Sequence, residues 1–463
     1  MHKIFRVLLI VLYFSGLFYQ TAEAQPSPEL PIYIVQSGDT LSIIAQRFGT
    51  TVDDLIKVNN LTNPNILNIG TELKIPGLEG ITGVLTTMSL EIGDTIRSTV
   101  LRNNLSTDQI IRLNRIIIPT RLFAGTTFII PKTSETSMLH PALFPENDDT
   151  YLDTAIALLS NPWKIKMDNR SNGFWDFLPS EVLFTSTKSE KSSSLISPYF
   201  TYFELGPMPI YQGKTLVIRI KSSFPLELTG EIAGQKITFL KQSAQNYIAL
   251  QGIHATLNPG IFPFKLAGTS PGKSPFSFEQ MVVIQSAGYG AMEYISGVDP
   301  KTIDPANTVP EDNKVLAITT VINPEKYWDG QFKNPSYFPD VITSYFGRPR
   351  SYNNGAFTYF HSGIDFGYGN KLPIYSPANG KVVFAESTIV RGNAVIIDHG
   401  WGIFSGLWHQ SEIKVKVGDT VVPGQIIGLV GNTGRSNGSH LHWEVWAGGV
   451  QVDPMDWLKK IYP

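Results

Sequence analysis

The sequence predicts a multidomain, mainly β protein with small βααβ modules, a β-sandwich and a C-terminal antiparallel β domain. Three patterns predict this fold class. Residues 31–131 contain a duplicated unit of strands and helices, residues 201–270 alternate apolar and polar side chains, and residues 341–463 consist of short apolar runs between glycine-rich turns. At 463 residues the chain is too long for one ordinary hydrophobic core, so we expect several domains.

Composition narrows the chemistry. Hydrophobic residues make up 42% and charged residues 16% of the chain, and the net charge of −2 gives no global signal for nucleic acid or for an anionic membrane. The chain has no cysteine, so any metal must be held by His, Asp or Glu. Histidines gather between His361 and His442, which is the first local indication of a site.

The N-terminus predicts a cleavable secretory signal over residues 1–24. Lys3 and Arg6 precede an apolar run at residues 7–18, and small residues provide a cleavage site after Ala24. An uncleaved anchor helix is the alternative, but the run is shorter than the roughly 20 residues that a bilayer requires. No later segment is long and apolar enough to span a membrane. We therefore expect a secreted protein that is extracellular or associated with the cell wall.

An internal repeat aligns residues 31–76 with residues 84–131 without a gap, at the spacing that separates Asn59 from Asn114. Each copy reads as strand, helix, helix, strand. In the first copy the apolar spacing predicts a helix that stops at Gly49, and Thr51 can cap the second helix. Further matched positions are Gly38-Asp39-Thr40 with Gly93-Asp94-Thr95, Pro64 with Pro119, Gly70-Thr71 with Gly125-Thr126, and Pro76 with Pro131.

These residues resemble LysM modules, which bind glycans that contain N-acetylglucosamine, such as peptidoglycan or chitin. The resemblance implies glycan contacts at Gly38, Asp39, Thr40 and Asn59. The second copy is degenerate, and whether it binds glycan stays open. Its departures are Thr99, Asn103 and Asn104 in place of Ile44, Phe48 and Gly49. For both copies, a small spacer domain without a ligand is the alternative.

The middle of the chain gives weaker signals. Residues 133–200 match no motif and are expected to be partly loop-like, with a Ser/Lys run at residues 185–194. Residues 201–270 predict an Ig-like β-sandwich module, in which His254 is interpreted as structural. Residues 299–340 are interpreted as a polar linker and a helix-compatible segment.

The C-terminal domain, residues 341–463, carries three histidine-bearing segments that could reach a common point. His361 and Asp365 lie four residues apart, but nearby glycines argue against a helix, so a turn that leads into a strand is expected. His440 and His442 are at positions i and i+2 of a predicted strand, so both rings should face one side. A third segment, Leu407-Trp408-His409-Gln410, ends another apolar strand.

The order of these motifs resembles the lysostaphin-type (LytM-like) zinc metalloendopeptidases. In this sequence Gly431-Asn432-Thr433-Gly434 stands between the strand-end histidine and the His-x-His segment, and several flanks agree. The agreeing flanks are Phe346-Gly347-Arg348, Gly363-Ile364-Asp365, Ile397-Asp398-His399-Gly400, Val417-Gly418-Asp419 and Gly424-Gln425-Ile426-Ile427-Gly428. Many relatives carry an aromatic-x-His-Leu pattern where this chain has Leu407-Trp408-His409-Gln410, a difference that we expect to affect substrate preference before activity.

The resemblance implies one Zn²⁺ per catalytic domain, held by His361, Asp365 and His442, with His409 and His440 as catalytic histidines that are not ligands. Two imidazoles and one carboxylate leave the fourth position of tetrahedral zinc open, as catalysis requires. The two other histidines could then exchange protons with water and the leaving amine, in roles that the sequence does not divide between them. Elsewhere in the domain, His399 is interpreted as structural, and Glu444 either as a partner of the site or as a strand-exposed carboxylate.

Together these resemblances predict a secreted peptidoglycan hydrolase. It would be a zinc-dependent endopeptidase that cleaves peptide cross-links or stem peptides of the bacterial cell wall, tethered by LysM glycan binding, with no nucleic-acid partner. One alternative is a non-catalytic or latent wall-binding adaptor that activates another hydrolase. Another is a binder of chitin-like glycans whose peptidase domain is occluded. The intact set of five site residues favours the enzyme.

Overall fold

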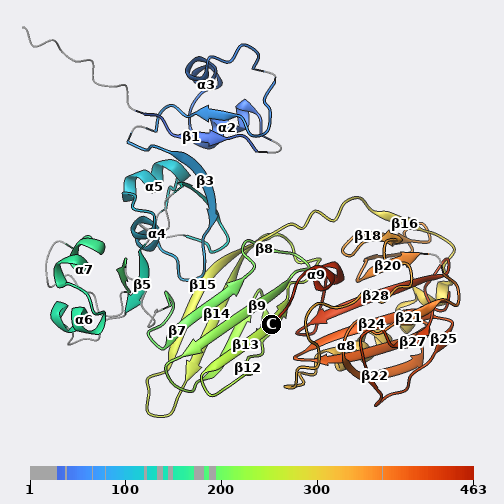
Figure 1. The fold of residues 1–463 in the computed structure, drawn as a ribbon. Helices are drawn as coiled ribbons and strands as arrows, with labels where there is room; N and C mark the ends of the chain where they lie inside the picture. Colours follow the sequence, from blue (N-terminus) through green and yellow to red (C-terminus); the bar gives the residue numbers. More distant parts are fainter. Residues whose placement is uncertain are drawn as a thin grey trace, which may run out of the picture. The chain divides into compact units, whose positions relative to one another are not determined.

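A computed structural model describes residues 29–36, 39–64, 66–78, 80–118, 122–132, 139–143, 150–171, 182–186, 194–367 and 369–463 (Figure 1). The predicted signal, residues 1–24, and Gly38 lie outside the described residues. The chain divides into two compact units, and residues 1–87, 105–117 and 129–134 make up the first of them. The remaining residues make up the second unit.

The first repeat has the predicted order of strand, helix, helix, strand. Its elements are β1 (Ile32–Ile34), α2 (Leu41–Phe48), α3 (Val52–Asn59) and β2 (Glu72–Lys74), and the two strands pair antiparallel. The Thr40 side chain caps α2, Gly49 ends it in the left-handed conformation with φ 70°, and Thr51 caps α3. The apolar face of α2 is buried. The predicted helix stop at Gly49 and the predicted cap at Thr51 are both confirmed.

The second repeat keeps this fold despite its degenerate positions. Its elements are β3 (Val84–Ser89), α4 (Ile96–Arg102), α5 (Thr107–Asn114) and β4 (Thr127–Pro131). The buried Thr99 hydroxyl donates to the Thr95 carbonyl at 2.9 Å, and the Asn103 amide donates to the Thr99 carbonyl at 2.8 Å. Asn104 adopts φ 51° where the first repeat has Gly49. Thr99 and Asn103, whose side chains make hydrogen bonds within the helix, thus replace the apolar Ile44 and Phe48 of the first repeat.

Residues 139–186 contain regular elements that the sequence did not reveal. They are β5 (His140–Leu143), α6 (Tyr151–Ala157), α7 (Pro162–Asp168) and β6 (Leu183–Thr185), with β5 and β6 antiparallel. The helices have seven residues each, too short to give a clear apolar period. Most of the predicted Ser/Lys loop, residues 187–193, lies outside the described residues.

The predicted β-sandwich is present and extends past the expected boundary at residue 270. One sheet has the order β12-β13-β9-β7 and the other β11-β10-β14-β15-β8. Their bounds are β7 (Phe200–Gly206), β8 (Ile210–Tyr211), β9 (Thr215–Ser222), β10 (Glu227–Ile232), β11 (Gln235–Ile237), β12 (Leu240–Lys241), β13 (Asn246–Gly252), β14 (Gly260–Thr269) and β15 (Phe276–Gln285). His254 follows β13 and contacts the Thr256 hydroxyl at 2.8 Å, in keeping with a structural role.

The segment expected to be a linker is partly built into the C-terminal domain. It contains a 3-10 turn (Pro300–Thr302) and α8 (Pro305–Thr319), and β16 (Glu293–Ile295) precedes it. Asp304 caps α8, and Pro305 occupies its first turn. Val315 of α8 joins a buried cluster with Phe384, Trp408 and Trp446 of the C-terminal sheet. The helix therefore packs on the domain that follows it.

The C-terminal domain is organised around one large antiparallel sheet with the order β17-β20-β28-β24-β23-β22-β26, in which β29 also pairs with β28. Two smaller sheets have the orders β16-β18-β19 and β21-β27-β25. The bounds are β17 (Ile342–Ser344), β18 (Pro349–Tyr352), β19 (Phe357–Phe360), β20 (Ile364–Gly367), β21 (Pro373–Tyr375), β22 (Gly380–Ser387), β23 (Asn393–Gly400), β24 (Ile403–Gln410), β25 (Glu412–Ile413), β26 (Thr420–Val421), β27 (Ile426–Leu429), β28 (His440–Ala447), β29 (Val450–Val452) and α9 (Pro454–Lys459). Among the described residues, no helix combines the length and apolarity needed to cross a membrane.

Candidate metal centre and active site

Strand register brings the three histidine-bearing segments together. β28 lies between β20 and β24, and antiparallel pairing sets Asp365 opposite His442 on one side and Trp408 opposite His442 on the other. His409 follows Trp408 directly and ends next to the same place. His361 precedes β20, in the turn that the sequence predicted. The three histidine-bearing segments thus form one site because the strands that carry or adjoin them are neighbours in the sheet.

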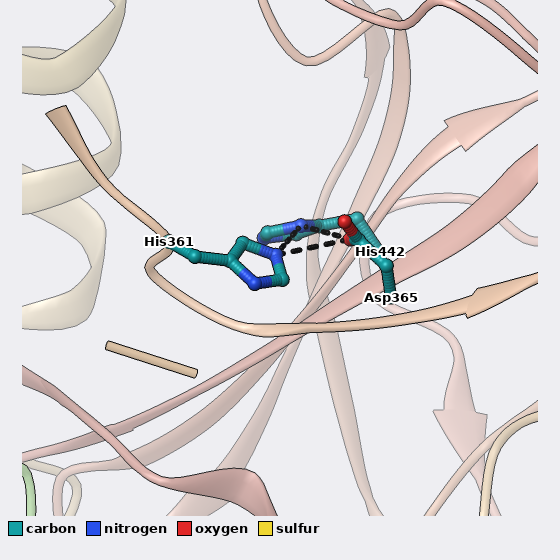
Figure 2. Close-up of side chains that lie close together, drawn as sticks. All are labelled: His361, Asp365 and His442. Atoms are coloured by element: carbon teal, nitrogen blue, oxygen red, sulfur yellow. Dashed lines mark hydrogen bonds and ion pairs between the residues drawn. The ribbon is translucent and has the colours of Figure 1, made fainter. Parts of the chain in front are cut away.

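Three buried side chains point donor atoms at one another (Figure 2). His361 Nε2 lies 3.0 Å from Asp365 Oδ1 and 3.0 Å from His442 Nδ1, and His442 Nδ1 lies 2.8 Å from Asp365 Oδ1. These are the three residues that the resemblance named as ligands. The structure brings all of them together.

Hydrogen bonds on the outer atoms orient both imidazoles. His361 Nδ1 lies 2.8 Å from the Tyr345 carbonyl oxygen, so it carries the proton and leaves Nε2 with a lone pair. His442 Nε2 lies 3.0 Å from a carboxylate oxygen of Glu444, which leaves Nδ1 with a lone pair. Two nitrogen lone pairs and a carboxylate oxygen about 3 Å apart repel one another unless a cation lies between them. The residues therefore fit a divalent metal ion.

Two carboxylates and an arginine outside the ligand set hold it in place. Asp365 Oδ2 accepts a hydrogen bond from Arg350 at 2.6 Å, and Arg350 also donates to Glu293 at 3.1 Å. Glu444 is buried and accepts from Ser362 at 2.6 Å as well as contacting His442. Such outer partners fix ligand orientation and basicity. Glu444 is thus a partner of the site and is not strand-exposed.

Sequence reasoning missed Arg350 and Glu293. Arg350 comes two residues after the matching Phe346-Gly347-Arg348 flank, which was the one available signal. Glu293 lies on β16, in a stretch between the predicted sandwich and the predicted linker. It reaches the site because β16 pairs in parallel with β18.

The protonation of His361 and Asp365 suits a metal ion, whereas for His442 burial is outweighed by hydrogen bonds to Asp365 and Glu444, which raise its pKa. Burial lowers the pKa of His361 to about 4, so this imidazole is neutral near neutral pH. Burial alone would raise the pKa of Asp365, but the neighbouring charges of His361, His440 and Arg350 outweigh it and hold the pKa well below the ordinary value. Burial likewise opposes ionisation of Glu444, yet hydrogen bonding to His442 lowers its pKa to about 2. A neutral imidazole and an ionised carboxylate are the forms that bind metals.

His409 and His440 lie beside the donor atoms with their rings 4.8 Å apart. His409 Nδ1 is 2.7 Å from the Thr433 carbonyl oxygen, and His440 Nδ1 is 2.8 Å from the Gly438 carbonyl oxygen. Each Nδ1 proton is therefore used by the backbone, and each Nε2 keeps a lone pair for proton transfer. Burial holds the pKa of His409 well below its ordinary value. Both predicted catalytic histidines are thus part of the site.

The Gly-x-Thr-Gly segment has a structural role in this arrangement. The Thr433 backbone carbonyl accepts from His409, and the Thr433 hydroxyl accepts from the Asn393 amide at 2.9 Å. Gly434 adopts φ 76°, and a Cβ there would lie 2.4 Å from the Gly392 nitrogen. The motif therefore fixes the direction in which His409 points.

His361, Asp365 and His442 line a cavity of about 360 Å³. Its lining includes the aromatic residues Tyr352 and Tyr359 and the guanidinium of Arg435, which lies 5.1 Å from the Tyr352 ring centre and 5.9 Å from that of Tyr359. Such a wall offers both flat apolar surface and hydrogen-bond donors to a bound chain. The site can therefore admit a substrate larger than water.

Other residues that the sequence singled out have structural roles in their contacts. His399 is fully buried between the Asn379 carbonyl oxygen at 2.8 Å and the Ser405 hydroxyl at 2.9 Å, away from the donor atoms. In the first repeat, Asp39 accepts from Tyr33 and from the Gln36 amide, Thr40 caps α2, and Asn59 binds the backbone of Lys74. These contacts are all made within the module. A glycan role for these residues stays a prediction, and Gly38 lies outside the described residues.

Three convergent ligands, outer hydrogen bonds and two histidines with free Nε2 atoms define the site of a metal-dependent hydrolase. Residues 359–454 match peptidase family M23, and residues 33–76 and 91–131 match the LysM domain. The chain thus carries an M23 (LytM-like) peptidase domain and LysM domains, as the sequence predicted.

Named relatives agree with this domain assignment. The chain is 42% identical over 95 residues to the peptidoglycan DD-endopeptidase ShyA of Vibrio cholerae, which covers 20% of this chain and 22% of that protein. It is 38% identical over 95 residues to the DD-carboxypeptidase/endopeptidase Mpg of Neisseria meningitidis, again over 20% and 22% of the two chains. The match therefore spans about a fifth of the length of these two curated relatives. The structure of the antimicrobial peptidase lysostaphin from Staphylococcus simulans matches at 35% identity over 21% of this chain and 44% of that one, with a TM-score of 0.21.

Proposed function

We propose that this protein is a secreted peptidoglycan hydrolase. It acts as a zinc-dependent endopeptidase on peptide cross-links or stem peptides, at or outside the cell wall, and its LysM modules tether it to glycan. The observation that carries the proposal is the convergence of His361 Nε2, Asp365 Oδ1 and His442 Nδ1 within 3.0 Å of one another, beside two further histidines.

Zinc is the metal that we propose, because two imidazoles and one carboxylate are a common donor set of catalytic zinc. When bound, zinc would supply a Lewis acid to polarise the scissile carbonyl. The chain's own groups handle protons. One of His409 and His440 can accept the proton of the attacking water at Nε2, and the imidazolium formed can then return that proton to the leaving amine. Glu444 and Arg350 keep the ligand side chains in position throughout.

Peptidoglycan is the substrate class that we propose, because both the peptidase domain and the LysM domains support it. The curated relatives of the chain include named peptidoglycan DD-endopeptidases, residues 359–454 match the M23 peptidase family, and the N-terminal part carries LysM domains. Tethering to glycan raises the local concentration of peptide bonds around the catalytic domain, so weak glycan binding is sufficient.

The first test is hydrolysis of the wall polymer itself. The chain from Gln25 onward is incubated with purified peptidoglycan, with and without a zinc chelator, and new amino groups and released fragments are measured by mass spectrometry. We expect amine release that stops with chelator and returns with zinc, and the fragment masses identify the bond. Protein that contains zinc but releases no amine would instead support the latent or non-catalytic adaptor.

Two histidine variants separate metal binding from proton transfer. His442→Ala should lose both metal and activity, because it removes one of three donor atoms. His440→Ala should keep its metal but lose about 100-fold in kcat, the usual contribution of an acid–base group. Metal content is measured by elemental analysis, and Glu412→Gln, at an exposed position of the same domain, is the control. Full activity in either histidine variant would show that the site is assigned wrongly.

A further inference from the structure

Residues 139–186 repeat the element order of the two LysM domains. β5, α6, α7 and β6 follow one another as β1, α2, α3 and β2 do, and β5 and β6 pair antiparallel as β1 and β2 do. The LysM match itself covers only residues 33–76 and 91–131. Element order alone is weak support, so the test is whether individual positions coincide.

The helix caps recur at a constant spacing. The first helix of each unit begins after Thr40, Thr95 and Thr150, positions 55 residues apart, and each threonine accepts a hydrogen bond from the amide three residues later. The second helix begins after Thr51, Ser106 and Asn161, again 55 residues apart, and each side chain caps its helix. No insertion or deletion is needed over these residues.

An asparagine makes the same three hydrogen bonds in each unit. In the third unit the Asn169 amide nitrogen donates to the carbonyls of Ile165 and Phe184, both at 2.8 Å, and its oxygen accepts from the Phe184 amide at 2.9 Å. Asn59 does this with Leu55 and Lys74, and Asn114 does it with Ile110 and Ile129. The three asparagines are 55 residues apart, and each binds the strand residue 15 positions later. Each one ties the end of its second helix to its closing strand.

Core positions and backbone conformation coincide as well. Leu55, Ile110 and Ile165 each have 0% exposure on the inner face of the second helix. After that helix the chain adopts a positive φ at Asn60 (51°), Arg115 (50°) and Arg170 (53°), and after the first helix at Gly49 (70°), Asn104 (51°) and Leu159 (47°). Such angles are uncommon for residues other than glycine, and rare for leucine. Chance does not place them at one spacing three times.

From this correspondence we infer that residues 139–186 are a third copy of the LysM-type repeat and bind the same class of glycan, a polymer containing N-acetylglucosamine. The choice of ligand rests on the proposed function of the first two copies. The third copy has Leu159 where the first copy has Gly49, and one buried cluster among its described residues consists of alanine, leucine and isoleucine side chains. Three linked modules also hold a polymer more tightly than two, since each added contact is intramolecular.

A matched series of variants tests the inference in the full mature chain. Asn59→Ala, Asn114→Ala and Asn169→Ala each remove the same clamp from one unit and leave backbone groups without a partner. Binding to purified peptidoglycan sacculi is measured in chelator, and hydrolysis of a soluble peptide is measured with metal. We expect Asn169→Ala to weaken binding by about the same factor as Asn59→Ala, about tenfold. Peptide hydrolysis should be unchanged in Asn169→Ala.

Limited proteolysis and amide exchange show which unit each variant loosens. If Asn169→Ala leaves residues 139–186 protected, the buried-charge variant Ile165→Asp replaces it. A loosened third unit with undiminished binding overturns the inference. Failure of the wild type to bind sacculi in chelator, in contrast, overturns the tethering part of the proposed function. The wild-type binding measurement therefore distinguishes this outcome from failure of the third copy alone.

A direct measurement uses the N-acetylglucosamine hexamer as the probe. Hydrogen exchange of the full chain is followed by mass spectrometry with and without the hexamer. We expect slower exchange in peptides from residues 139–186 as well as from residues 31–76. Slowing in residues 31–76 alone would show that the third copy is a spacer.

Discussion

At the scale of single residues, the tautomers of His361 and His442, the two histidines proposed as metal ligands, are set by hydrogen-bond partners outside the proposed ligand set. His442 presents Nδ1 and His361 presents Nε2, and these opposite choices follow from where each ring finds an acceptor for its proton. For His442, the acceptor is Glu444, which holds the proton on Nε2 and leaves Nδ1 unprotonated. It is buried, ionised and also held by Ser362 and Gln451. A carboxylate in this position makes the imidazole a stronger donor to a metal.

Glu444→Gln should therefore weaken metal binding by about tenfold with little change in fold, because the amide keeps the shape of the side chain but not its charge. Metal affinity is measured by competition with a chromogenic chelator. Glu412→Gln, which removes an exposed carboxylate from the same domain, serves as the control. Equal affinity in the two variants would show that Glu444 acts only in packing.

At the scale of elements, the sequence predicted what local spacing determines. Residues i and i+2 of one strand face the same side, so the pairing of His440 with His442 followed from their spacing alone. The helix stop at Gly49 and the helix cap at Thr51 followed from similar local rules. Glu293 and Arg350 could not be found this way, because they are 57 residues apart and meet only through the pairing of β16 with β18. The third repeat was missed because a degenerate copy keeps its hydrogen bonds but loses its glycines.

Helix α8 shows how an element outside the predicted domain can shape the site. Its buried Glu311 accepts hydrogen bonds from the backbone amides of Val390 and Arg391, at 2.8 and 2.9 Å. The Arg391 carbonyl in turn accepts from the His409 amide at 3.0 Å. His409 has a φ of 64°, a conformation that its neighbours must hold. Glu311 is thus a positioning residue that acts on His409 through Arg391.

Glu311→Gln should lower kcat by about tenfold while the metal content stays at one per chain, since small misplacement of an acid–base group is costly. The split between kcat and metal content is the informative measurement. Asp312→Asn is the matched control, because this neighbouring residue is more exposed and bonds only the outer end of the Arg391 side chain. A variant with reduced metal content would place the effect on folding instead.

At the scale of the whole molecule, the sandwich and the peptidase domain share an interface within the second unit. Lys214 of the sandwich forms ion pairs with Asp453 and Asp456, at 3.0 and 3.1 Å. Gly252, at the end of β13, lies where a Cβ would come 2.8 Å from Val450 of β29. Absence of a side chain at Gly252 is what permits this approach. The two domains should therefore unfold together.

Gly252→Ala should destabilise this joint transition by about 1–3 kcal/mol, because the added methyl group has no room without backbone movement. Scanning calorimetry of the full chain measures the effect as a lower midpoint or as two separate transitions. Gly260→Ala is the control, since a Cβ there meets its nearest atom at an ordinary 3.7 Å. Similar unfolding midpoints for both variants would mean that the interface accommodates the added methyl group without loss of stability.

Acid sensitivity of the peptidase domain is the last property that follows from its buried histidines. His399 is fully buried, and burial lowers its pKa from 6.5 to about 4. The unfolded chain binds a proton at this residue near pH 6.5, whereas the folded chain does so only near pH 4. The stability that neutral His399 contributes is therefore complete above about pH 6.5 and is lost as the pH falls towards 4, by up to about 3 kcal/mol.

His399→Asn should accordingly be less stable than the wild type at pH 7.5, because it loses packing against Phe332 and a hydrogen bond, but the difference should shrink as the pH falls to 4.5. Unfolding of both proteins is measured in chelator, without metal. His361, His409 and His442 then titrate in the same way in the variant and in the wild type, so their contributions cancel in the difference. Calorimetric midpoints of the peptidase transition across this pH range provide the measurement. A difference that stays constant with pH would show that His399 is protonated as readily in the folded protein as in the unfolded chain, and the acid sensitivity would then belong to the metal-site histidines.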